Sequence, residues 1–177
     1  MSVDLERIAN VADAEAVASL VNKAYRPEDG VRGWTHESGL IAGERTNARQ
    51  VADAINRTDS FVLLGLKGQE IVACVHVEKE GTECHIGMLA VSPSLQGKGI
   101  GNRMLSQAED FARMTFSSET FTILVLSARP ELISFYTKRG YQRTGGAIDY
   151  PFLAGVGIPK LRGLKVEVLK KRSDNAP

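Results

Sequence analysis

One short segment constrains the fold more than any other part of this sequence. It runs from Leu89 to Gly101 and joins an apolar, strand-like stretch to a helix-like one, with glycines alternating at positions 97, 99 and 101. Glycine lets the backbone turn tightly and approach a ligand closely. Amides at the start of a helix attract phosphate, because the helix dipole also favours negative charge there. The segment therefore predicts a phosphate-binding loop between a strand and a helix.

Two common phosphate-binding loops fit this segment poorly. The nucleotide P-loop requires Ser or Thr after Gly-Lys, whereas Gly97 and Lys98 are followed by Gly99. A dinucleotide-binding fingerprint requires a glycine where the chain has Asn102. A glycine-rich turn that binds nothing is the remaining alternative for the loop taken alone.

Hydrophobic periodicity predicts helices and strands on both sides of the loop. The expected helices cover residues 13–25, 46–57, 102–116 and 130–138, and the expected strands cover 61–66, 71–77, 83–91, 120–127, 141–144 and 166–169. A strand-helix-strand order in the middle implies a right-handed crossover and a parallel pair in an otherwise antiparallel sheet. We expect one α/β domain over residues 1–172 and a disordered tail over residues 173–177.

Composition excludes several classes of function. The chain has 22 Lys and Arg against 21 Asp and Glu, which argues against a nucleic-acid binder that relies on many phosphate contacts. Two cysteines, Cys74 and Cys84, are too few for a disulfide scaffold or a cysteine-rich zinc module. His36, His76 and His85 lack metal-ligand spacing, so we expect no metal. No apolar run could span a bilayer and no signal peptide is evident, so we expect a cytoplasmic protein without membrane contact.

Two segments together resemble the signatures of the GNAT N-acetyltransferase superfamily. Gln96, Gly99 and Gly101 match the defined positions of its Gln/Arg-x-x-Gly-x-Gly/Ala motif, and residues 135–141 resemble its downstream Phe/Leu-Tyr-x-x-x-Gly-Phe/Tyr element. The order of helices and strands also matches, so the resemblance covers roughly residues 4–170. It implies a single-domain GNAT-like fold with a mixed, mostly antiparallel central sheet and about four helices. Its parallel strand pair would be splayed, with a gap between about Leu89 and Val125 for the acyl group.

The resemblance implies that acetyl-CoA is the cosubstrate. In that superfamily the loop amides hold the pyrophosphate of coenzyme A, and the pantetheine arm pairs with the preceding strand. The positions that match are Leu89, Val91, Gln96, Gly97, Lys98, Gly99, Gly101 and Asn102. Arg129 stands where many members carry Asn; it could reach the pantetheine or a phosphate, or pair with Glu131.

Tyr136 matches the tyrosine that, in many members, protonates the leaving thiolate of coenzyme A. A phenol with a pKa near 10 can donate that proton; the alternative is a core aromatic. A base is needed to deprotonate the attacking amine, and Glu83 and His85 lie on one face of the strand before the loop. Glu83 is the first candidate and His85 the second. The alternative is a solvated Glu at the start of a strand beside a satisfied His. Other members of the superfamily use no dedicated base, because proximity on the enzyme supplies much of the rate.

The resemblance also implies an acceptor pocket between two loops. Trp34 and Glu37 follow the first helix, and Asp149 and Tyr150 follow a late strand. An aromatic ring with carboxylates would suit a cationic amine. The alternative for Trp34 is that it anchors a long loop to the core.

The sequence thus predicts an acetyl-CoA-dependent N-acetyltransferase. It would move an acetyl group to a primary amine, in a small molecule, an amino acid or a peptide N-terminus, by direct attack in a ternary complex. One alternative is a non-catalytic acyl-CoA sensor or regulatory subunit, and another is an unrelated nucleotide binder. Homodimers are frequent in the superfamily, although no exposed apolar stripe in this sequence points to one.

Overall fold

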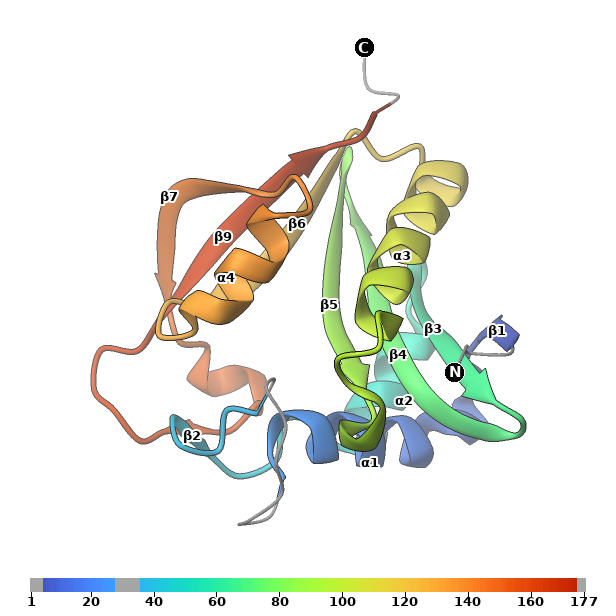
Figure 1. Cartoon of the computed structure of the whole chain (residues 1–177), viewed down its shortest axis with the longest axis horizontal. Coiled ribbons are helices and arrows are strands. Elements are labelled where there is room, and N and C mark those ends of the chain that lie inside the picture. The colour runs from blue at the N-terminus through green and yellow to red at the C-terminus, as the bar shows by residue number, and fades with distance from the viewer. Residues whose placement is uncertain (1–4, 28–35, 175–177) are drawn as a thin grey trace.

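The computed structural model describes residues 5–27 and 36–174. The helices are α1 (Ala14–Tyr25), α2 (Ala48–Asn56), α3 (Ile100–Phe116) and α4 (Pro130–Thr137). The strands are β1 (Leu5–Ile8), β2 (Ile41–Ala42), β3 (Ser60–Lys67), β4 (Glu70–Glu80), β5 (Glu83–Val91), β6 (Thr120–Leu126), β7 (Gln142–Asp149), β8 (Ile158–Pro159) and β9 (Lys165–Arg172). Within the described ranges, a seven-stranded sheet has the order β1-β3-β4-β5-β6-β9-β7, and β2 pairs with β8 (Figure 1).

The predicted fold class is confirmed. In the described part of the chain, every pairing within the large sheet is antiparallel except the parallel pair β5 and β6. The predicted helices and strands are present, and the β5 bounds agree with the prediction. The sequence did not reveal β1, β2 and β8, because segments of two to four residues are too short to show a period.

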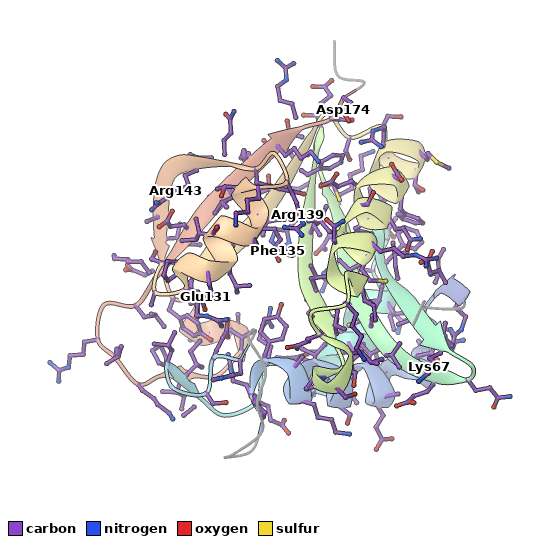
Figure 2. All side chains as sticks on the ribbon, in the orientation of Figure 1. Lys67, Glu131, Phe135, Arg139, Arg143 and Asp174 are labelled. Carbon is purple, nitrogen blue, oxygen red and sulfur yellow. The ribbon has the colours of Figure 1, made fainter. Side chains whose placement is uncertain are left out.

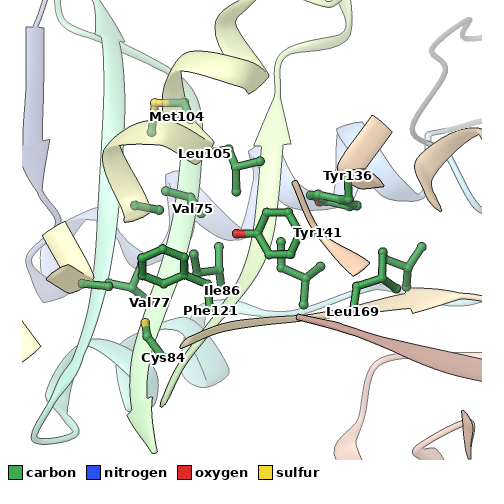
Figure 3. Close-up of a cluster of buried hydrophobic side chains, with 14 of the residues drawn as sticks. Val75, Val77, Cys84, Ile86, Met104, Leu105, Phe121, Tyr136, Tyr141 and Leu169 are labelled. Atoms are coloured by element: carbon green, nitrogen blue, oxygen red, sulfur yellow. The ribbon is translucent and has the colours of Figure 1, made fainter. Parts of the chain in front are cut away.

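Two apolar cores cover the two faces of the sheet. Alternate residues of a strand point to opposite faces, and β4 divides its side chains accordingly. Val75 and Val77 join the core beneath α3 and α4, whereas Cys74 joins the core beneath α1 and α2. Figure 3 shows the first of these cores, with the rings of Tyr136 and Tyr141 inside it. The helix that carries Tyr136 is thus fixed to the sheet by packing.

The parallel strands β5 and β6 separate along their length. Their pairing is confined to residues 83–85 of β5 and 120–122 of β6, and Figure 1 shows the two strands diverging from there. A bulge also interrupts β5, because Met88 and Leu89 together lie opposite Val75 of β4. Met88 has a φ of +50°, which is unusual for a residue other than glycine. Bulges redirect side chains and end strand pairing, so β5 and β6 enclose space between them.

The C-terminal segment is held more firmly than the expected tail over residues 173–177. The backbone N–H of Ser173 donates to the carbonyl of Glu119 at 2.8 Å, and Arg113 Nε donates to Ser173 Oγ at 3.1 Å. Ser173 is buried, so the packed domain extends at least to this residue. Over residues 5–27 and 36–174, no helix is both long and apolar enough to cross a membrane.

Candidate active site

The glycine-rich loop leads from β5 into α3. Gly97 and Gly99 have φ values of +77° and +81°, a region that glycine occupies without strain. A Cβ atom built on either residue would meet no atom within 4 Å, so both border open space. The side chain of Gln96 folds back and donates from Nε2 to the carbonyl of Val91 at 3.1 Å. The loop is thereby tied to the end of β5.

A first cavity of about 230 Å³ lies between this loop, the start of α3, the end of β5 and α4. Most residues predicted to bind coenzyme A line it, together with the predicted acid Tyr136. They are Leu89, Val91, Gln96, Gly97, Gly99, Gly101 and Asn102. The sequence prediction therefore converges on one concave site.

Two predicted cofactor residues lie outside this cavity lining. Lys98 is exposed and donates from Nζ to the carbonyl of Ser94 at 3.4 Å. Arg129 is buried at the start of α4 and forms an ion pair with Glu131. For Arg129 the structure shows the pairing that the sequence analysis had left as the alternative.

Sequence reasoning missed Arg139, which contributes a positive charge to the cavity wall. Its guanidinium carbon lies 3.6 Å from the centre of the Phe135 ring, and its Nε donates to Asn102 Oδ1 at 2.6 Å. Figure 2 shows Phe135 and Arg139 on the side of α4 that faces α3. Burial lowers the pKa of Arg139. Arg139 lies in the turn after α4, where its Nη1 donates to the carbonyl of Phe135 at 2.6 Å. The available signal was a basic residue three positions after the predicted acid, Tyr136.

A second cavity of about 270 Å³ occupies the space between β5 and β6. Its wall includes His85 and Leu89 of β5 and Val125 of β6, so the expected gap between Leu89 and Val125 is present. The two cavities share four wall residues: Tyr25, Leu89, Leu132 and Tyr136. They therefore meet at the bulge of β5.

Two tyrosines stand where the cavities meet. Tyr136 is only 7% exposed, and burial raises its pKa, which keeps the phenol protonated. Among the described residues, none forms a hydrogen bond with its hydroxyl. Tyr25, at the end of α1, was not predicted as a site residue; its hydroxyl donates to the carbonyl of Leu89 at 2.8 Å. Tyr25 thus fixes the backbone of the bulge.

Glu83 and His85, the two candidate bases, have different surroundings. Glu83 lies outside both cavity linings and about 20 Å along β5 from Leu89, at about 3.3 Å per residue. Lys170 Nζ at 2.6 Å and Thr122 Oγ1 at 2.8 Å donate to its carboxylate and lower its pKa. The structure therefore does not bring Glu83 together with Tyr136. His85 lines the second cavity, and burial lowers its pKa. Its Nε2 is buried without a hydrogen-bond partner in the described residues.

The residues predicted to bind the acceptor do not all lie at the second cavity. Glu37 and Tyr150 line the second cavity, and the Tyr150 hydroxyl donates to the carbonyl of Val156 at 2.7 Å. Asp149 does not line it: its side chain is 83% exposed and pairs with Lys165. Trp34 lies outside the described residues. The expected arrangement of an aromatic ring with two carboxylates is therefore not assembled by the described residues.

Known structures share this fold at low sequence identity. The protein smu.2055 of Streptococcus mutans UA159 is 15% identical, with a TM-score of 0.72 over 96% of this chain and 99% of that one. The ribosomal-protein-S18-alanine N-acetyltransferase of Escherichia coli is 14% identical, with a TM-score of 0.70 over 98% and 97%. The PaiA N-acetyltransferase of Thermoplasma acidophilum, in complex with coenzyme A, is 16% identical, with a TM-score of 0.71 over 95% and 98%.

The sequence itself carries a family signature. No individually curated protein matches it significantly. The profile of the acetyltransferase (GNAT) family matches residues 21–141, which include the end of α1, the loop and all of α4. This match extends over more than half of the chain and includes both motifs that the sequence analysis singled out. The chain therefore belongs to the acetyltransferase (GNAT) family, whose members use acetyl-CoA.

Proposed function

We propose that this chain moves the acetyl group of acetyl-CoA to a primary amine by direct attack in a ternary complex. One observation carries the proposal: the two cavities share the wall formed by Tyr25, Leu89, Leu132 and Tyr136. The first would receive acetyl-CoA and the second the amine. Such an arrangement would hold both reactants at one point, and proximity of this kind supplies a large part of the rate.

The first cavity has the features that coenzyme A requires. Acetyl-CoA would supply the reactive thioester. Gly97 and Gly99 leave room beside the loop for a pyrophosphate, because neither has a side chain there. The start of α3 favours negative charge, and Arg139 adds a guanidinium to the wall. Leu89 and Val91 offer β5 backbone to the pantetheine arm.

Tyr136 is our candidate for the general acid. When the amine bonds to the acetyl carbon and the carbon–sulfur bond breaks, the sulfur needs a proton. A buried phenol that stays protonated can donate it. Cys74 and Cys84 line neither cavity, and burial raises the pKa of each thiol to about 12. Neither suits the nucleophile of an acyl-enzyme, which supports direct transfer.

We propose His85, rather than Glu83, as the base that takes the amine proton, and expect His85→Gln to lower kcat/KM about tenfold at pH 7. Burial lowers the His85 pKa, so the neutral imidazole persists at pH values where an exposed one would be charged. When rates are calculated for the concentration of unprotonated amine, the decrease in wild-type kcat/KM at acid pH should therefore occur below pH 6.5. The matched change Glu83→Gln should leave kcat/KM within twofold. The reverse ranking of the two variants would restore Glu83 as the candidate.

Ligand-dependent thermal unfolding tests the proposed function first. Acetyl-CoA and free coenzyme A should each raise the unfolding temperature, and ATP should not. A ligand at 100 times its Kd adds about 2.7 kcal/mol to the free energy of unfolding. Thiol release from acetyl-CoA should then depend on an added amine. Stabilisation by coenzyme A without thiol release for any amine would instead indicate an acyl-CoA sensor, and stabilisation by ATP alone would indicate a nucleotide binder.

A further inference from the structure

Positive and negative side chains do not balance in the described wall of the second cavity. Among the described residues that line it, the charged side chains are Arg26, Glu37 and Arg45. Arg26 Nη2 lies 3.2 Å from Glu37 Oε2, and both side chains are buried. Arg26 also donates to the carbonyls of Gly43 at 2.9 Å and Val156 at 3.0 Å. This pair is neutral overall and holds the wall together, so it leaves no net charge for an acceptor.

Arg45 is the charge that remains. Its backbone N–H donates to Asn22 Oδ1 at 2.8 Å, which fixes the chain just before α2. Its guanidinium carbon lies 5.9 Å from the centre of the Tyr25 ring. The guanidinium makes no ion pair and no hydrogen bond with any residue in ranges 5–27 and 36–174. The described wall of the second cavity therefore has one uncompensated positive charge.

Tyr25 connects this charge to the point where the cavities meet. One face of the tyrosine lies beside Arg45, while its hydroxyl is bonded to Leu89 at the bulge. An anionic group held by Arg45 would thus lie next to the place where acetyl transfer is proposed. Much of the remaining wall is apolar, including Ile86, Ile123, Val125, Leu132, Val156 and Val166. Its volume of about 270 Å³ is at the small end for ligand sites.

Building on the function proposed above, we propose that the acceptor is an apolar α-amino acid whose carboxylate binds Arg45. A guanidinium and a carboxylate form strong, charge-assisted hydrogen bonds. A polyamine would instead add positive charge beside Arg45, in a wall with little polar surface to compensate it. The amine group of an amino acid is close to its carboxylate, so binding at Arg45 would keep it near the bulge. This acceptor differs from the cationic amine that the sequence favoured.

Matched pairs of acceptors, with and without the carboxylate, distinguish the contribution of the carboxylate from that of the amine. Thiol release from acetyl-CoA is measured with L-leucine, L-phenylalanine and L-methionine, with the amide of each, with spermidine and with an alanyl peptide. The amides keep the amine and the apolar body but lack the carboxylate. For wild type we expect kcat/KM to be at least tenfold higher for an amino acid than for its amide. Arg45→Gln should abolish this ratio by raising KM with little change in kcat, and Arg45→Lys should keep part of it.

Arg49 provides the control, because it is an exposed arginine of α2 outside the cavity. Arg49→Gln should leave the ratio of acid to amide unchanged. Equal or better turnover of the amides or of spermidine would overturn the role of Arg45 while leaving the acetyltransferase intact. A preference for the acids that survives in Arg45→Gln would also overturn it. No turnover of any acceptor, with coenzyme A still bound, would overturn the proposed function itself.

Discussion

Replacing Tyr136 by phenylalanine should lower kcat about 100-fold and leave the binding of acetyl-CoA unchanged. The change removes only the hydroxyl, the group proposed to protonate the leaving sulfur, and general acids contribute about 10²–10⁴ to rates. The ring contacts with Phe135 and Tyr141, at 5.1 and 5.8 Å between centroids, would remain. Thiol-release kinetics give kcat, and thermal shifts with coenzyme A check that the first cavity still binds.

Tyr141→Phe is the matched control for this experiment. Tyr141 is buried in the same core, and its hydroxyl donates to Glu109 Oε1 at 2.9 Å, outside both cavity linings. Losing this buried bond should cost about 1–3 kcal/mol of stability, with kcat retained. The two variants should therefore differ: Tyr136→Phe should lose kcat, whereas Tyr141→Phe should lose stability and keep kcat. If Tyr136→Phe kept wild-type kcat, the phenol would be a packing residue, and the acid would have to be sought elsewhere.

The loop and the strand pair could be predicted because their signals are local. Polar–apolar alternation over residues 83–86 marks the start of β5, and glycine at positions 97 and 99 matches backbone that turns through positive φ. The same locality explains the limit of the prediction for Glu83. A period of two correctly places Glu83 and His85 on one face, but it does not say which of them lies near the bulge. The competing partner of Glu83, Lys170, comes from β9, which is remote in sequence.

The wall residues that were missed depend on packing between elements. From the sequence, Tyr25 is only a residue in the last turn of a helix, and Arg45 is only a charged residue in the loop before the next helix. Their importance arises when α1 packs behind β5, so that the Tyr25 hydroxyl reaches Leu89. The carboxylates of Glu37 and Asp149 were the reason why the sequence favoured a cationic acceptor. Pairing Glu37 with Arg26 and Asp149 with Lys165 removes both carboxylates from that count.

Gly99→Val should raise the KM for acetyl-CoA more than 100-fold and abolish the thermal shift caused by coenzyme A. The new side chain would enter the open space beside the loop, where the pyrophosphate is proposed to bind. It would also force a non-glycine residue into left-handed backbone at a φ of +81°, which costs about 1–2 kcal/mol. Loss of affinity alone would therefore not separate a blocked site from a strained loop.

The variant Gly81→Val distinguishes a blocked binding site from a strained loop. Gly81 lies in the turn between β4 and β5, with a φ of +63° and no atom within 4 Å of an added Cβ, but it borders neither cavity. Both variants should lose similar stability without ligand, in urea unfolding, because both carry the same backbone strain. Only Gly99→Val should lose the response to coenzyme A, because only there does the side chain fill a binding space. If both variants bound coenzyme A as wild type does, the space beside Gly99 would not hold the pyrophosphate, and the glycines of the loop would serve only to turn the chain.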